Sequence, residues 1–206
     1  MNGITGNSPA ARARRRMLIL ALIFALPILI AYALYYSGWR PESSGNYGEL
    51  VRPPRPLPAL TLETIEGKTL ALEALRGKWS LVVFAPDECR DPCTANLDKM
   101  QRVILAQGKE AERVRAVLAV TDARTRDGLR DAIKAYPGML VVAGPAAPVR
   151  AFAARFELTP GVPPDNLNRV YLVDPIGNFM MSWPADADAN RMRKDLARLL
   201  RVSQVG

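Results

Sequence analysis

The only residues of this chain suited to redox or soft-metal chemistry are its two cysteines, Cys89 and Cys93. They follow residues 80–85, an apolar run with the length and composition of a buried strand, and they precede a segment whose apolar residues recur at helical spacing. Between them, Asp91 and Pro92 suit the N-cap and the first position of that helix. A thiol at a helix N-terminus faces the positive end of the helix dipole, which favours the reactive thiolate.

Histidine is absent from all 206 residues. Its absence removes the side chain that most often performs acid–base catalysis near neutral pH, and also the commonest metal ligand. Many classes of enzyme are thereby excluded, and any chemistry is expected to centre on the two thiols.

Three uses of the cysteine pair stay open from the residues alone. A dithiol can exchange disulfides with a client, and Cys89 is then the expected nucleophile because it precedes the helix and should be the more exposed of the two. Two thiolates can also hold Cu(I), a soft ion that accepts near-linear coordination. Alternatively the pair is a structural disulfide, although so short a spacing closes too small a loop to stabilise the fold greatly.

The N-terminal part of the chain predicts a membrane anchor. Residues 17–36 form an uncharged run long enough to span a bilayer, preceded by a tail, residues 1–16, that carries Arg12, Arg14, Arg15 and Arg16. The positive-inside rule then places the tail in the cytoplasm. We expect a single-pass protein of the inner (cytoplasmic) membrane, with its globular domain in the periplasm or an equivalent extracytoplasmic space. A cleaved signal peptide is the competing interpretation, but the apolar run is longer than the usual hydrophobic region of such peptides.

Beyond the anchor, residues 37–58 are rich in Pro and Gly and are expected to be a semi-extended tether. Residues 59–206 are expected to form one α/β domain. The predicted order is a hairpin at 60–72, strands at 80–85, 114–121 and 140–143, and a returning hairpin at 169–183, with helices after each of these strands and at the C-terminus. This order predicts a mixed sheet flanked by helices on both faces, with Cys89 at the carboxyl end of a central strand.

The formal net charge of +8 includes the four arginines before the anchor, and the other basic residues are scattered along the chain. They are not interleaved with aromatic residues as in nucleic-acid-binding surfaces. We therefore expect no nucleic-acid partner.

Residues 57–201 resemble the SCO/SenC family of membrane-anchored, thioredoxin-like proteins of cytochrome c oxidase assembly. The similarity is carried by LPALTLETIEGKTLALEALRGKWSLVVFAPDECRDPC, which ends at Cys93, and by the hairpin RVYLVDPIGNF. Family members bind copper through two cysteines spaced like Cys89 and Cys93 and through a histidine just before the returning hairpin. The matching position here is Asn166, so this chain resembles a divergent member that lacks the copper-ligand histidine.

The resemblance implies a thioredoxin-like fold and an assembly factor for cytochrome c oxidase. The CxxxC dithiol of Cys89 and Cys93 is expected to act by thiol–disulfide exchange with the copper site of a client, such as the copper-bearing oxidase subunit, or by Cu(I) delivery to it. Thioredoxin-type oxidoreductases have two residues between their cysteines, so a dedicated client is expected rather than general disulfide reduction. The opposing hypothesis is a non-catalytic assembly scaffold with a structural disulfide.

Overall fold

The structure is a computed structural model of the whole chain, and it describes residues 9–38, 45–86, 89–122, 126–166 and 168–203. It divides into two units, residues 1–44 and residues 45–206. The first contains helix α1 (Pro9–Tyr36), the one helix in the described residues that is long and apolar enough to cross a membrane. This confirms the predicted N-terminal apolar helix as a candidate for a transmembrane span.

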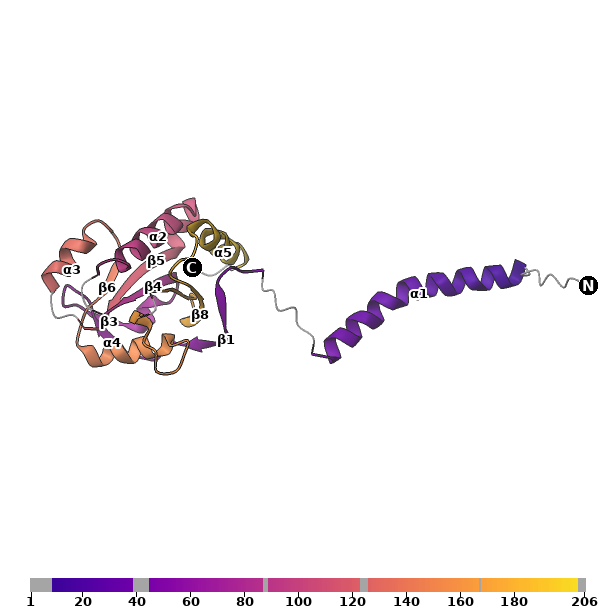
Figure 1. The fold of residues 1–206 in the computed structure, drawn as a ribbon, viewed down its shortest axis with the longest axis horizontal. Helices are drawn as coiled ribbons and strands as arrows, with labels where there is room; N and C mark the ends of the chain where they lie inside the picture. The colour runs from indigo at the N-terminus through magenta and orange to yellow at the C-terminus, as the bar shows by residue number, and fades with distance from the viewer. Residues whose placement is uncertain (1–8, 39–44, 87–88, 123–125, 167, 204–206) are drawn as a thin grey trace, which may run out of the picture. The chain divides into compact units, whose positions relative to one another are not determined.

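The second unit is built on a six-stranded mixed sheet, shown in Figure 1. The strands β4, β5 and β6 run parallel, while β7, β8 and β1 are antiparallel to their neighbours. In spatial order they are β1 (Glu49–Pro56), β8 (Asn178–Trp183), β7 (Val170–Val173), β4 (Trp79–Ala85), β5 (Val114–Val120) and β6 (Leu140–Val142). A separate hairpin pairs β2 (Thr61–Glu63) with β3 (Thr69–Ala71). All of the predicted strands are present.

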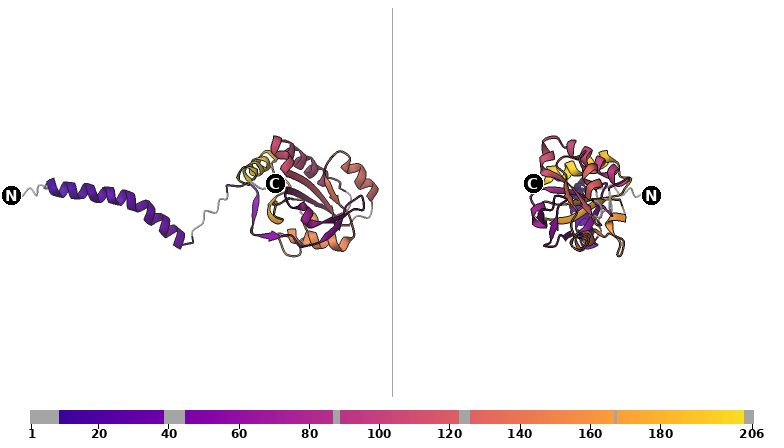
Figure 2. Two further views of the ribbon diagram at one scale, coloured as in Figure 1. Left: turned by 180° about the vertical axis from the view of Figure 1, so that it is seen from behind. Right: turned by 90° about the vertical axis from the view of Figure 1, so that its left-hand side faces the viewer.

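Helices cover both faces of this sheet, as Figures 1 and 2 show. On one face pack α2 (Cys93–Leu105), α5 (Ala189–Val202) and residues of α3 (Arg126–Ile133). On the other lie α4 (Ala146–Ala153) and the 3-10 turn η3 (Ala154–Phe156), together with η1 (Leu72–Leu75). The remaining 3-10 turns are η2 (Gly108–Arg113) and η4 (Pro164–Asn166). The predicted thioredoxin-like architecture of a mixed sheet between helices is thus confirmed.

Strand β4 shows why the sheet is buried on both faces. Its side chains alternate between the two apolar clusters: Leu81 and Val83 point toward α2 and α5, whereas Val82 and Phe84 point toward α4. All four are at most 2% exposed. This continuous apolar run is typical of a central strand with parallel and antiparallel neighbours, and it places the end of β4 at the middle of the sheet.

The region predicted as a tether differs from the structure, because residues 49–56 form the edge strand β1, which pairs with β8. Just before β1, the buried Asp195 carboxylate of α5 accepts hydrogen bonds from the backbone N–H groups of Tyr47 and Gly48 at 2.8–3.1 Å and from Trp183 Nε1 at 3.0 Å. A side chain at Gly48 would meet the Trp183 ring nitrogen at 2.6 Å. The globular unit therefore begins near residue 45 rather than at residue 59.

Candidate redox site at the start of helix α2

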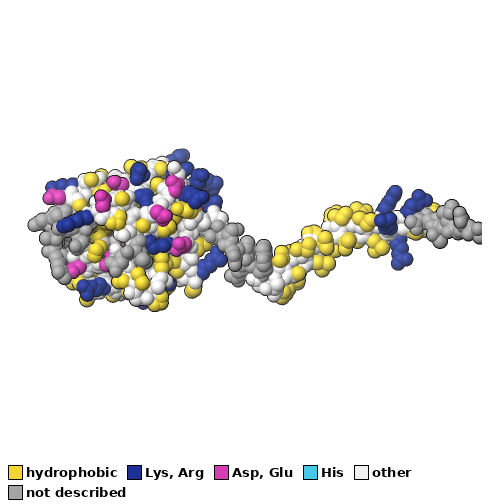
Figure 3. All heavy atoms as spheres, in the orientation of Figure 1, with side chains coloured by type: hydrophobic (Ala, Val, Ile, Leu, Met, Phe, Trp, Pro, Cys, Tyr) yellow, Lys and Arg dark blue, Asp and Glu magenta, His cyan; other side chains and the backbone are white. Residues whose placement is uncertain are grey.

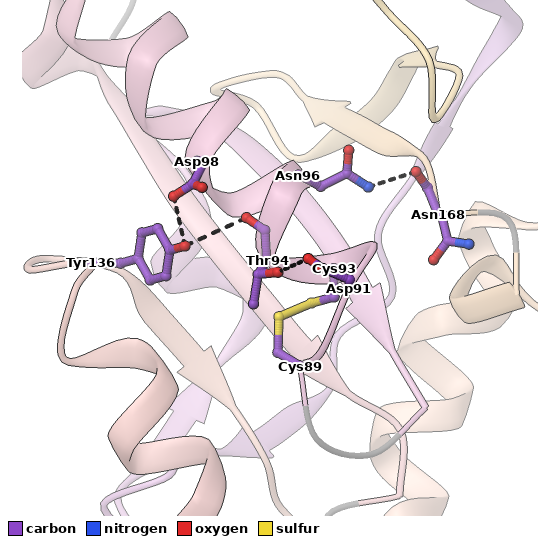
Figure 4. Close-up of a disulfide and its surroundings, with 8 residues drawn as sticks. All are labelled: Cys89, Asp91, Cys93, Thr94, Asn96, Asp98, Tyr136 and Asn168. Atoms are coloured by element: carbon purple, nitrogen blue, oxygen red, sulfur yellow. Dashed lines mark hydrogen bonds between the residues drawn. A yellow bond between two sulfur atoms is a disulfide. The ribbon is translucent and has the colours of Figure 1, made fainter.

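The cysteine pair lies where the sequence predicted it, between the carboxyl end of β4 and the start of α2. The start of the helix is shifted by one residue from expectation. Pro92 is the N-cap residue, with φ −92° and ψ 7°, and Cys93 is the first residue of α2. Asp91, predicted as the N-cap, instead accepts a hydrogen bond from the Thr94 hydroxyl (Figure 4). Cys93 thus occupies the helix end, where the dipole favours a thiolate.

Cys89 and Cys93 form a disulfide, with their Cα atoms 5.2 Å apart. The expectation that Cys89 is the more exposed is wrong, since Cys89 is 4% and Cys93 7% exposed. Both belong to the apolar cluster that also contains Leu97 and Leu129. Because both residues are this deeply buried, a reacting partner needs local opening to reach either sulfur.

A hydrogen-bonded tyrosine lies beside the first turns of α2. The Tyr136 hydroxyl donates to Asp98 Oδ1 at 2.7 Å and to the Thr94 carbonyl at 3.4 Å (Figure 4). Burial, with the hydrogen bond and charge of Asp98, raises the pKa of Tyr136 to about 12. Tyr136 therefore stays protonated near neutral pH and ties the segment after α3 to the helix that carries Cys93.

The loop before β7 reaches the same end of the sheet. Asn96, one turn after Cys93 and 2% exposed, donates from Nδ2 to the backbone carbonyl of Asn168 at 2.6 Å. Asn168 itself adopts a left-handed conformation with φ 48°. Three positions earlier in the loop, Asp165 Oδ2 accepts a hydrogen bond from Thr121 Oγ1 at 2.5 Å. The side chain of Asn166, the position that the family resemblance singled out, lies outside the described residues.

The sequence did not reveal Asn96 or Tyr136 as neighbours of the cysteines. Asn96 had one signal, a polar residue on the apolar face of a helix, because it shares that face with Leu97 and Met100. Tyr136 had none, because it was predicted only as part of an apolar stripe.

The described donor atoms at this site suit Cu(I) better than Cu(II). Cys89 and Cys93 supply two sulfurs, enough for near-linear Cu(I), whereas Cu(II) also needs nitrogen or oxygen donors. Among the described residues, no three His, Cys, Asp or Glu side chains form a group that could hold a metal. Among the described residues, the two reduced thiols are thus the ligands available to Cu(I).

A pocket of about 530 Å³ opens at the carboxyl ends of β4 and β5. It is lined by Pro86, the residue after β4, by Thr121 and Asp165, and by Arg150 and Glu157 from the side of α4 and η3. Both acidic and basic side chains line the pocket, and Pro86 begins the segment that leads to Cys89.

The family model described as transmembrane-like, thioredoxin-like, C-terminal domain matches residues 79–203. No curated protein matches the sequence.

Solved structures share the fold. Copper-bound ScoI of Bradyrhizobium japonicum is 21% identical, with a TM-score of 0.55 over 69% of this chain and 98% of that one. Copper-bound yeast Sco1 is 19% identical, with a TM-score of 0.61 over 73% and 91%. BsSco, a member of the Sco family of cytochrome c oxidase assembly proteins in which a disulfide switch is identified, is 17% identical, with a TM-score of 0.56 over 75% and 100%. The thioredoxin-like fold is therefore confirmed, and these similar structures are Sco proteins, as the resemblance implied.

Proposed function

Because the chain belongs to the family of transmembrane-like proteins with a thioredoxin-like C-terminal domain, we propose that it is a membrane-anchored assembly factor for cytochrome c oxidase. It acts through the thiols of Cys89 and Cys93 on the copper site of its client, the copper-bearing oxidase subunit. The observation that carries this proposal is the disulfide at the start of α2, at the carboxyl end of the central strand β4. Two of the similar structures are Sco proteins with copper bound, and the third, BsSco, has a disulfide switch.

Thiol–disulfide exchange is the chemistry that the site supports best. In the reduced protein, the thiolate of Cys89 attacks one sulfur of a client disulfide, which releases the other client thiolate and forms a mixed disulfide. The thiolate of Cys93 then attacks the Cys89 sulfur. This step releases the second client thiol and leaves the Cys89–Cys93 disulfide. Two electrons pass to the client, and a dithiol protein must supply two electrons to reduce the pair again.

Cys89 is assigned the first attack because of where it lies on the chain, since exposure does not separate the two residues. Cys93 is held in α2, where its N–H donates to the Arg90 carbonyl at 2.6 Å. Cys89 lies outside regular secondary structure. Bringing its sulfur to the surface therefore costs less than unwinding the start of the helix.

Cu(I) delivery is the second candidate, and the donor set favours it over any use of Cu(II). The reduced pair offers two thiolates, and the described residues add no third strong ligand. An ion held by two ligands can pass to a client site that offers more of them. Both candidates need the reduced pair, whereas a non-catalytic scaffold needs neither thiol.

Trapping the mixed disulfide tests the proposal. The full chain carrying Cys93→Ser should accumulate a covalent complex with the copper-bearing subunit, one that a reductant dissolves, because the resolving thiol is missing. Cys89→Ser and the double serine variant are the matched controls and should accumulate none. A free-thiol assay in the protein's own compartment adds a second readout. Two results together would instead establish the non-catalytic scaffold. The double serine variant would support normal oxidase assembly, and the cysteine pair of the wild type would always be oxidised.

A further inference from the structure

The C-terminal helix α5 carries a stripe of basic side chains that the proposed redox function does not use. Arg191, Lys194, Arg198 and Arg201 are all exposed and lie within roughly 80° of one another around the helix. The exposed Val202 continues the same stripe. Figure 3 shows Lys and Arg side chains gathered over this end of the globular unit. We call these four residues the basic stripe.

The four side chains of the basic stripe are not neutralised by salt bridges among the described residues. Asp195, the one acid within α5, is buried and is occupied by Tyr47, Gly48 and Trp183, and the N-cap residue Asp188 accepts a hydrogen bond from the backbone N–H of Arg191. Four like charges that lie this close together repel one another. The stripe is therefore a surface to which an anionic partner would bind favourably.

The basic stripe lies beside the segment that leads to the membrane anchor. Arg198 Nη1 donates to the Gly45 carbonyl and, at 3.2 Å, to Asn46 Oδ1. The Arg191 guanidinium stacks over the Tyr47 ring, 4.7 Å from its centroid. Gly45 follows Tyr36, the last residue of α1, by nine positions, so the extended chain cannot carry it more than about 30 Å from that residue. If α1 crosses a bilayer, the short connection therefore keeps Gly45 near the membrane surface.

From this juxtaposition we propose that the basic stripe docks on the anionic phospholipid headgroups of the membrane that α1 spans. The inference rests on α1 crossing a bilayer and is independent of the thiol chemistry. Each basic residue near an anionic surface contributes only a modest attraction. The anchor, however, holds the stripe at a high effective concentration beside the lipid, so a weak interaction suffices. Docking orients the domain, with α5 toward the headgroups.

The acylation of single lysines in the full chain tests this docking. The protein is placed in bilayer discs of phosphatidylcholine alone or with phosphatidylglycerol added, and a water-soluble amine reagent is followed by mass spectrometry. Lys194 reports on the stripe, and the exposed Lys68 in the β2–β3 turn is the internal control. Lys194 should react about fivefold more slowly in the anionic discs than in phosphatidylcholine alone. This factor corresponds to the attraction of about one basic residue to an anionic membrane surface. Lys68 should be unchanged, and molar salt should restore the rate for Lys194.

Charge-reversal variants make the test specific. Arg201→Glu should abolish the lipid-dependent slowing at Lys194, while the matched change Lys78→Glu, at an exposed site outside α5, should preserve it. Equal rates for Lys194 in both kinds of disc would overturn the proposal. So would slowing in phosphatidylcholine alone, equal slowing at Lys68, or slowing that needs an added acidic protein. Because no client or redox partner is present, none of these outcomes depends on the proposed oxidase-assembly role.

Discussion

Asn96 and Asn168 connect the two parts of the chain that the family resemblance brings together, the cysteine pair and the loop before β7. The 2.6 Å hydrogen bond from Asn96 Nδ2 to the Asn168 carbonyl fastens that loop to the first turn of α2, which begins at Cys93. The hydrogen bond thereby holds the loop against the helix that carries Cys93. Asn166 ends η4, two positions before Asn168, so it is the position at which to supply the missing imidazole.

We predict that Asn166→His creates a Cu(II) site that the native chain lacks. An amide is a poor substitute for imidazole, so the reduced wild-type protein should form no persistent Cu(II)–thiolate complex. The reduced variant should show a sulfur-to-copper charge-transfer band in visible absorption when Cu(II) is added. The band should vanish when Cys89 or Cys93 is replaced by serine. A band in the wild type would mean that another group completes the site, and a colourless variant would mean that position 166 does not reach the sulfurs.

The sequence singled out Cys89 and Cys93 as candidates for chemistry but did not predict that both are buried. Cys89 and Cys93 stood out because no other residues of the chain offer thiol chemistry, and the switch from strand to helical periodicity located them. Both cysteines belong to an apolar cluster that draws residues from segments far apart in the chain, such as Leu129 and Leu172, and no local pattern reports which distant segments meet there. For the same reason the bond between Asn96 and Asn168, which joins two distant segments, became visible only in the fold.

At the scale of elements, the Cys89–Cys93 disulfide closes a very short loop, so we predict that its reduction leaves the domain folded. The loss of chain-entropy stabilisation is about 2 kcal/mol. The melting temperature should then fall by roughly 5 °C, which thermal scans of the oxidised and reduced full chain would measure. The double serine variant is the control and should melt with the reduced protein. Unfolding upon reduction would instead identify the disulfide as a structural staple.

The Asp195 carboxylate is the main polar link between α5 and the segment before β1. We predict that Asp195→Asn lowers the free energy of unfolding by about 2–3 kcal/mol, because an amide of the same shape satisfies fewer of the three donors, two of them in buried hydrogen bonds. Denaturant titration of the solubilised full chain measures this loss. The exposed Asp186→Asn is the matched control and should change stability little. Equal free energies of unfolding for the two variants would show that the charge of the buried carboxylate does not stabilise the fold.

Strand β1 was missed because its prolines resemble those of a linker. Pro53, Pro54 and Pro56 lack the N–H that a central strand needs on both sides. β1 is an edge strand, however, and pairs only with β8, so its outer side requires no donor. Its pairing also shifts register between Leu50 and Arg55, which blurs any alternation of apolar and polar residues. The strongly periodic elements, such as β4, β5 and α5, were predicted correctly from sequence.

For the molecule as a whole, basic residues before the anchor are expected to set its orientation in the membrane, whereas those of the distant helix α5 are not. The positive-inside rule counts residues close to the ends of a membrane span. Four arginines lie just before residues 17–36, whereas Arg40 and Arg52 are the basic residues within the first 16 positions after them. The basic stripe of α5 is far along the chain, in a domain that would be translocated regardless of its charge. It therefore does not compete with the arginine cluster in setting the orientation.

We predict accordingly that a reporter enzyme active only outside the cytoplasm, fused after Gly206, is active and remains with the membrane fraction. The control is the same fusion with Arg12, Arg14, Arg15 and Arg16 replaced by Gln, which should lower the reporter activity because the charge difference that orients α1 is lost. Activity of a cytoplasm-specific reporter at the same position would contradict the orientation. A soluble form that begins near Leu34 would show that the apolar run is a cleaved signal peptide, in which case the domain would have no anchor to hold α5 near lipid.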